Sequence, residues 1–157
     1  MASDLQLREL EMGIYGTRAD LHWYLEEIRA HLDHPLELSS PGAAYELHYL
    51  ESDELVSPED SEEDRMTVAE FCSELPEQWR DEHPGEDPGD RTVFYVCVGL
   101  LSSREEFDYF AERLPTLICP EPFHKGPCRM PWFSGSLPPS DDEERARLEA
   151  RYSHLRP

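Results

Sequence analysis

The sequence is poor in basic residues. It has a single lysine, Lys125, and 14 lysines and arginines together against 35 aspartates and glutamates, which gives a formal net charge of −21 over 157 residues. A charge this negative repels the phosphate backbone of nucleic acids, and no local basic stripe offsets it, so we expect no direct binding to nucleic acid. The same charge attracts basic proteins and raises their rate of association.

Long apolar runs and closely spaced cysteines are also missing. No stretch approaches the roughly 20 apolar residues of a membrane helix, and the first residues lack the apolar run of a secretory signal. We therefore expect a soluble, cytoplasmic protein that does not bind membranes. The four cysteines, Cys72, Cys97, Cys119 and Cys128, include no Cys-x-x-Cys pair, which favours reduced thiols in such a compartment.

A strand–turn–helix pattern occurs twice in the chain. Gly13–Ile28 matches Gly99–Leu114 in residue type at nearly every position, at a constant offset of 86 residues. In each copy, a predicted strand has apolar residues at alternate positions. A residue with a hydroxyl side chain follows it, Thr17 or Ser103, and an acidic residue stands three positions later. This capping-box pattern begins a helix, and apolar residues at helical spacing follow it. The predicted repeats cover residues 5–33 and 91–116.

These two units predict an α+β fold. Ala44–Leu50 alternates as a strand should and follows the first predicted helix. Either Thr116–Cys119 or Met130–Phe133 supplies the corresponding strand after the second helix, at an edge because of the neighbouring prolines. The order β-α-β, insertion, β-α-β is that of a ferredoxin-like two-layer sandwich built from a duplicated βαβ unit.

The predicted strands also differ in whether one or both of their faces are apolar. Thr92–Leu101 is apolar on both faces and is predicted to lie at the centre of the sheet. The first strand carries Glu9 and Glu11, which we expect to point outward from an edge position. An edge of this kind allows two chains to pair into a homodimer.

Residues 1–139 are predicted to form one domain with an insertion. Residues 51–64 hold eight carboxylates in fourteen positions, a density that predicts an extended, solvated acidic linker. A capping box then predicts a short inserted helix from Thr67 to Leu75. Residues 140–157 predict a C-terminal helical tail with Leu148, Tyr152 and Leu155 on one face.

One proline-rich loop brings together three candidate metal ligands, Cys119, His124 and Cys128. Zinc prefers thiolate and imidazole donors of this kind. Three residues elsewhere are candidates for the fourth ligand: Cys97, His83 and His154. The simpler interpretation is two semi-buried thiols and a surface histidine with no cofactor, and a nucleophile–base pair of Cys119 and His124 is a further alternative. The acidic runs lack the spacing of a calcium-binding loop.

Two short segments resemble known families. Leu117-x-Cys119-x-Glu121 resembles the motif through which several viral proteins bind the retinoblastoma pocket, which implies a pocket protein as partner where the loop is exposed. Gly99–Phe110 resembles the strand–helix unit near the end of class V aminotransferases. Because the lone Lys125 lies in no cofactor-like context, that second resemblance implies no pyridoxal phosphate activity.

The charge supports the main functional prediction. We expect a non-enzymatic, acidic interaction module that binds and inhibits a basic protein such as a nuclease, toxin or DNA-binding factor. Trp23 or Tyr49 would act as an aromatic anchor. The predicted contact carboxylates are Glu9, Glu11, Glu54, Glu59, Asp60, Glu62 and Glu63. The alternatives are a small metal-binding or enzymatic domain that uses Cys119, His124 and Cys128, or an acidity that serves only solubility or salt adaptation.

Overall fold

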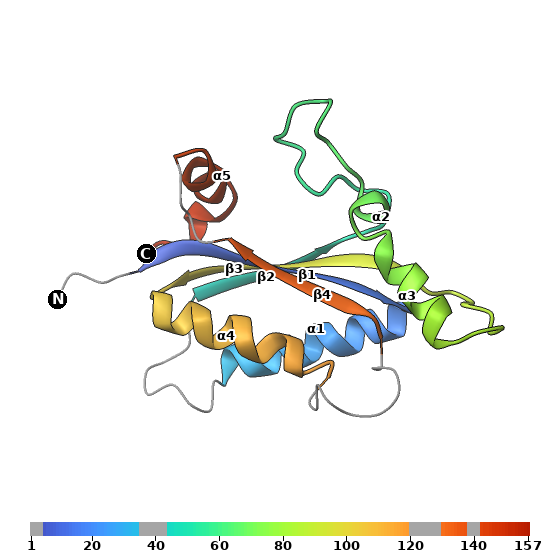
Figure 1. Ribbon diagram of the computed structural model, residues 1–157. Coiled ribbons are helices and arrows are strands. Elements are labelled where there is room, and N and C mark those ends of the chain that lie inside the picture. The colour runs from blue at the N-terminus through green and yellow to red at the C-terminus, as the bar shows by residue number, and fades with distance from the viewer. Residues whose placement is uncertain (1–4, 35–43, 120–129, 138–141) are drawn as a thin grey trace.

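The structure, a computed structural model, describes residues 5–34, 44–119, 130–137 and 142–157. These residues form an α+β fold with four strands, as the sequence predicts, and five α-helices (Figure 1). In chain order the elements are β1 (Gln6–Gly16), α1 (Arg18–Asp33), β2 (Ala44–Leu50), α2 (Val68–Phe71), α3 (Glu74–Glu82), β3 (Thr92–Ser102), α4 (Arg104–Thr116), β4 (Trp132–Leu137), α5 (Asp142–Tyr152) and a short 3-10 helix, η1 (Ser153–Leu155).

The strands form one antiparallel sheet in the order β2-β3-β1-β4. The two long strands β1 and β3 pair along their whole length, from Gln6 opposite Ser102 to Gly16 opposite Thr92. The central position predicted for the strand Thr92–Leu101 is therefore confirmed. The second edge strand, β4, begins at Trp132, so the later of the two candidate segments contributes to it and Thr116–Cys119 does not.

The edge position predicted for the first strand is wrong. β1 pairs with β3 on one side and with β4 on the other, so it has no free edge through which two chains could pair. The outward orientation predicted for Glu9 is also wrong, because its side chain is covered and the residue is only 4% exposed. Glu9 alternates with apolar residues because it lies on the face of β1 that α5 covers.

α1 and α4 cover one face of the sheet (Figure 1). Both begin with the predicted capping box, in which the hydroxyl of Thr17 or Ser103 accepts from a first-turn N–H and an acidic side chain accepts from the cap N–H. Such a cap contributes about 1 kcal/mol. The apolar stripes of both helices meet β1 and β3 in one large core cluster, in which Ile28 and Phe110 are fully buried. This face is a continuous apolar layer.

The opposite face carries α2, α3 and α5 (Figure 1). The predicted inserted helix is two helices: Thr67 caps α2, the helix ends at Cys72, and the chain continues as α3. Trp79 of α3 packs in an apolar cluster with β1 and β3. The C-terminal helix docks on the sheet as well, with Leu148 and Tyr152 buried in a separate cluster. The region between these two clusters is polar and forms the candidate site.

Candidate functional site

A polar centre lies on the α5 face of the sheet, between the two apolar clusters. Side chains along β1 alternate between the faces, and Met12 joins the core under α1 and α4. Glu9 and Glu11 therefore face the other way, toward α5. Tyr95 and Cys97 of the neighbouring strand β3 lie on the same face as these carboxyl groups. Two carboxyl groups are thus held side by side in the middle of a sheet.

α5 surrounds the Glu9 carboxylate with hydrogen-bond donors. Arg151 Nη1 donates to Glu9 Oε2 at 3.1 Å and to Oε1 at 3.3 Å. Tyr152 Oη also donates to Glu9 Oε2, and Arg147 Nη1 forms an ion pair with Oε1 at 4.0 Å. Although burial alone would raise the pKa of Glu9, the hydrogen bonds of Glu11 and Tyr152 and the charges of Arg151 and Arg147 hold that pKa below its usual value. Glu9 is therefore ionised at neutral pH.

Glu11 is the protonated member of the pair. Tyr95 Oη donates to Glu11 Oε2 at 2.5 Å. Burial, and then the hydrogen bond and negative charge of Glu9, raise the pKa of Glu11 to about 8. At pH 7 the two carboxyl groups therefore share a single negative charge, because a second one would be added in a poorly hydrated site.

Gly99 allows Tyr152 to reach this centre. A Cβ atom on Gly99 would overlap the Tyr152 ring, so the ring lies directly against the backbone of β3. Tyr152 is fully buried, and burial together with the neighbouring Glu9 raises its pKa. The phenol therefore stays protonated and donates to Glu9. Glycine at this position of the predicted repeat thus serves the docking of the C-terminal helix.

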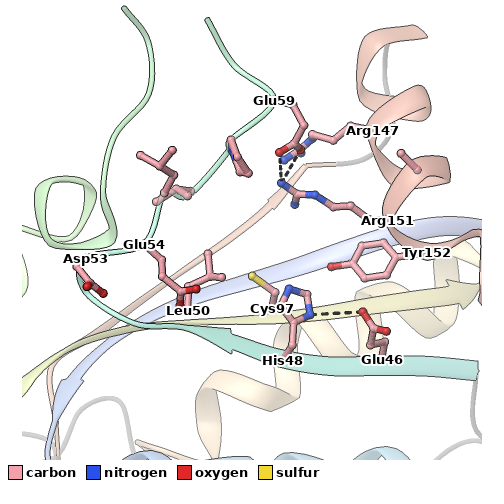
Figure 2. Close-up of a pocket in the computed structure, with 14 residues that line it drawn as sticks. Glu46, His48, Leu50, Asp53, Glu54, Glu59, Cys97, Arg147, Arg151 and Tyr152 are labelled. Carbon is pink, nitrogen blue, oxygen red and sulfur yellow. Dashed lines mark hydrogen bonds and ion pairs between the residues drawn. The ribbon is translucent and has the colours of Figure 1, made fainter. Parts of the chain in front are cut away.

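A cleft of about 700 Å³ opens beside the polar centre, between α5 and the loop 53–59 (Figure 2). We call it the α5 cleft. Its floor is formed by Glu46, His48 and Leu50 of β2 and Cys97 of β3. Arg151 joins its two walls, because Nη2 donates to Glu59 Oε1 at 2.6 Å while Nη1 holds Glu9.

The predicted contact carboxylates lie in different environments in the structure. Glu9 is buried in the polar centre and is not available to a partner. Glu11 is half-buried beside it. Glu54 and Glu59 line the α5 cleft. The remaining three are exposed in the loop that leads to α2: Asp60, Glu62 and Glu63.

The two predicted aromatic anchors lie elsewhere. Trp23 and Tyr49 are partly buried against the core under α1 and α4, on the other face of the sheet. They therefore lie away from the loop carboxylates, and their role as anchors stays a prediction. An exposed aromatic side chain on the correct face is Phe71, which is 44% exposed and contacts the rings of Tyr95 and Phe133.

The candidate metal loop is described only at its first residue. Cys119 is 7% exposed at the end of α4, whereas His124 and Cys128 lie outside the described residues, as does Glu121 of the Leu-x-Cys-x-Glu segment. Within residues 5–34, 44–119, 130–137 and 142–157, no group of three histidine, cysteine or acidic side chains is placed to hold a metal ion. The zinc prediction therefore stays a prediction.

Two other cysteines, Cys72 and Cys97, are buried free thiols. Burial raises the pKa of Cys72 to about 12. Burial, followed by the charges of Glu9 and Glu11, raises the pKa of Cys97 well above its usual value. Neither thiol is a thiolate nucleophile at neutral pH, because nucleophilic cysteines require a lowered pKa.

The sequence reasoning missed the groups that α5 contributes. Arg147 and Arg151 are four residues apart and flank Leu148, so they lie on the same side of the helix as its buried residues. In a chain with so few basic residues, two arginines beside an apolar stripe indicate a buried acidic partner. The sequence of β1 does not single out Glu9 as that partner, because Arg8 and Glu11 of the same strand are charged as well.

Comparisons with known proteins give no relative. No protein-family model matches the chain, no curated protein matches it, and no solved structure matches its fold. Among the described helices, none has the length and apolar character required to cross a membrane. Function is therefore inferred from the charge distribution and the geometry of the α5 face.

Proposed function

We propose that this chain is a non-enzymatic, acidic interaction module that binds a basic protein and inhibits it by covering its basic surface. The observation that supports this most strongly is the distribution of charge. Residues 51–91, here named the acidic segment, hold 16 of the 35 carboxylates but only 3 of the 14 basic residues. The other 116 residues hold 19 and 11. More than half of the surplus negative charge thus lies in about a quarter of the chain.

The structure places this segment on the α5 face, where the loop that begins it projects away from the sheet (Figure 1). Two of its carboxylates have an arginine partner within the described chain: Glu51 pairs with Arg18 at 2.8 Å, and Glu59 pairs with Arg151. Most of its other carboxylates are exposed. A one-sided field of this kind steers an oppositely charged protein toward the surface that carries it.

The chemistry of the partner follows from this charge. A nuclease, toxin or DNA-binding factor presents a basic surface that binds phosphates, and a cluster of exposed carboxylates competes for the same surface. Occupancy of that surface inhibits the partner without chemistry at the α5 face. We place the complex in the cytoplasm, a proposal supported by the free thiols of Cys72 and Cys97.

We also propose that the sheet with α1 and α4 is a ferredoxin-like sandwich derived from a duplicated βαβ unit. The 86-residue offset supports this, as do the capping boxes of the same type at α1 and α4. In addition, each helix connects two strands that are separated in the sheet by one strand of the other unit. A homologous chain with a single βαβ unit would strengthen this proposal.

Capture of partners from the native host at low and high salt tests the proposed function. The wild type should retain a basic protein at low salt and release it as salt screens the interaction. An amide variant of the loop should lose most of this binding, through the substitutions Asp60→Asn, Glu62→Gln, Glu63→Gln and Asp64→Asn. Addition of the wild type should also inhibit the captured protein.

A second amide variant is the matched control, because it changes the net charge by the same amount on α1 and α4. Its substitutions are Glu26→Gln, Glu27→Gln, Glu105→Gln and Glu112→Gln. We expect it to bind nearly as well as the wild type. Equal losses in the two variants would mean that only net charge matters, and no captured partner at low salt would contradict the proposal.

A further inference from the structure

The α5 cleft contains carboxylates that no lysine or arginine of the described chain neutralises. The arginines of α5 are already engaged, Arg151 with Glu9 and Glu59, and Arg147 with Glu144 and Glu9. In contrast, Glu46, Asp53 and Glu54 have no lysine or arginine partner within the described residues, and the short contact of Glu46 is to His154 Nε2 at 2.9 Å. The arginines on the α5 side of the cleft are therefore already paired, whereas carboxylates on the opposite side have no arginine partner within the described residues.

The floor of the cleft also holds a buried polar group without a partner. Cys97 is 2% exposed, its thiol points into the cleft (Figure 2), and it makes no hydrogen bond within the described chain. Beside it, the Nδ1 atom of His48 is buried and unbonded, with Glu46 Oε2 as its nearest acidic atom at 3.7 Å. Polar atoms left unsatisfied at the bottom of a cleft favour an occupant that brings its own donors.

The remaining lining suits the aliphatic part of a long basic side chain. Leu50, Leu55 and Val56 line the cleft together with Glu54. Arginine buries its methylene stem against such apolar surface and keeps its guanidinium at carboxylates, which accept its planar donors in pairs. A lysine offers a stem but lacks this paired donor geometry.

The spacing of the carboxylates indicates more than one basic side chain. Glu46 and Leu50 are four residues apart on β2, which corresponds to about 13 Å. Glu54 lies above Leu50, whereas Glu46 lies on the other side of Cys97 (Figure 2). In an extended segment, residues that are four apart and point the same way span the same distance.

We propose that the α5 cleft receives an extended basic segment of the partner protein, with one arginine at Glu54 and a second arginine, four residues away, at Glu46. This assignment rests on the proposed function and identifies where on the α5 face the partner is recognised. The exposed loop carboxylates attract the partner, and the cleft selects a segment with the correct spacing.

The test uses the synthetic peptide acetyl-Arg-Ala-Ala-Ala-Arg-amide as probe, with the full chain and calorimetric titration at low salt. The double variant Glu46→Gln/Glu54→Gln should bind it about tenfold more weakly than the wild type. The double variant Glu74→Gln/Glu77→Gln removes the same charge from α3 outside the cleft and should change affinity less than about twofold. Circular dichroism checks that both variants stay folded, and NMR should show shifts at His48 and Cys97 on binding.

The other possible results distinguish a failure of the cleft assignment from a failure of the proposed function. Equal weakening in both double variants, or NMR shifts away from His48 and Cys97, would overturn the cleft assignment and leave the proposed function standing. The same holds if the peptide fails to bind while a basic protein is still captured from the host. If neither the peptide nor a basic protein binds, the proposed function fails together with the cleft.

Discussion

The two faces of the sheet are built in different ways. Under α1 and α4, apolar residues form one continuous cluster. Under α2, α3 and α5, two smaller apolar clusters are separated by the pair Glu9 and Glu11 and by the α5 cleft. The first face gains its stability from apolar area, at about 25 cal/mol per Å². The second depends on charges that stabilise only while each has its partner.

This difference indicates that the two faces of the sheet have different roles. A continuous apolar face holds the sheet together with no buried carboxyl group among the described residues, although Arg8 is buried there against the Phe107 ring. The α5 face can therefore carry buried carboxyl groups, free thiols and an open cleft that would weaken a protein with only one covered face.

Removal of an aromatic ring from the continuous core should have the largest effect. Phe110 is fully buried, so Phe110→Ala leaves a cavity and should lower the free energy of unfolding by about 3–5 kcal/mol in urea denaturation. Phe71→Ala on the other face removes a ring that is 44% exposed, and should cost less than about 1 kcal/mol. A similar loss in both variants would contradict the proposed difference between the faces.

Neutralisation of Glu9 should have the next largest effect. Glu9→Gln removes the charge that Arg147 and Arg151 face, and a buried ion pair that loses one partner costs about 3 kcal/mol. The same urea denaturation measures this loss. The control is Glu149→Gln, because that exposed carboxylate pairs with Arg156 at the surface and should change stability little. A stability of Glu9→Gln equal to wild type would show that the α5 arginines do not depend on Glu9.

A methyl group at Gly99 should detach α5. Gly99→Ala places a carbon where the Tyr152 ring lies, and such overpacking costs about 2–3 kcal/mol. Hydrogen exchange should show faster exchange of α5 amides while α1 and α4 keep their protection. Gly135→Ala is the matched control, since no atom lies within 4 Å of its added Cβ. Loss of protection throughout the sheet would instead indicate that α5 is not a separable element.

The titration of Glu11 should be visible in the pH dependence of the free energy of unfolding. Between its ordinary pKa of 4.5 and the folded pKa of about 8, the folded state keeps a proton that the unfolded state has released, so the free energy of unfolding falls as pH rises. Glu11→Gln should remove this contribution, so its stability relative to wild type should rise steadily between pH 5 and pH 8.5. Urea denaturation at both pH values measures the difference. Parallel pH curves for the two proteins would show that Glu11 does not titrate in this range.

The sequence predicted the apolar face well. Thr17 and Ser103 identified the starts of α1 and α4, because a capping box is a local pattern that needs no knowledge of distant contacts. The apolar run from Thr92 likewise identified the central strand. In both cases the local pattern and the tertiary environment agree, so the pattern was sufficient.

The polar centre could not be predicted in the same way. Glu9 alternates with Leu10 on β1, which is typical of a half-exposed strand, and only the docking of Arg151 and Tyr152 from the far end of the chain makes it buried. Such contacts span more than 140 residues and leave no local pattern. The exposed positions of Asp60, Glu62 and Glu63 were predictable because dense like charge opposes burial wherever it occurs.

The docking of α5 has a consequence for synthesis. All four strands precede this helix in the chain, so the sheet leaves the ribosome before the arginines that surround Glu9 are available. During translation, where domains form progressively from the N-terminal side, Glu9 remains hydrated and the newly made sheet is open on one side. Emergence of α5 then closes the polar centre, so this face is completed only after all four strands have been made.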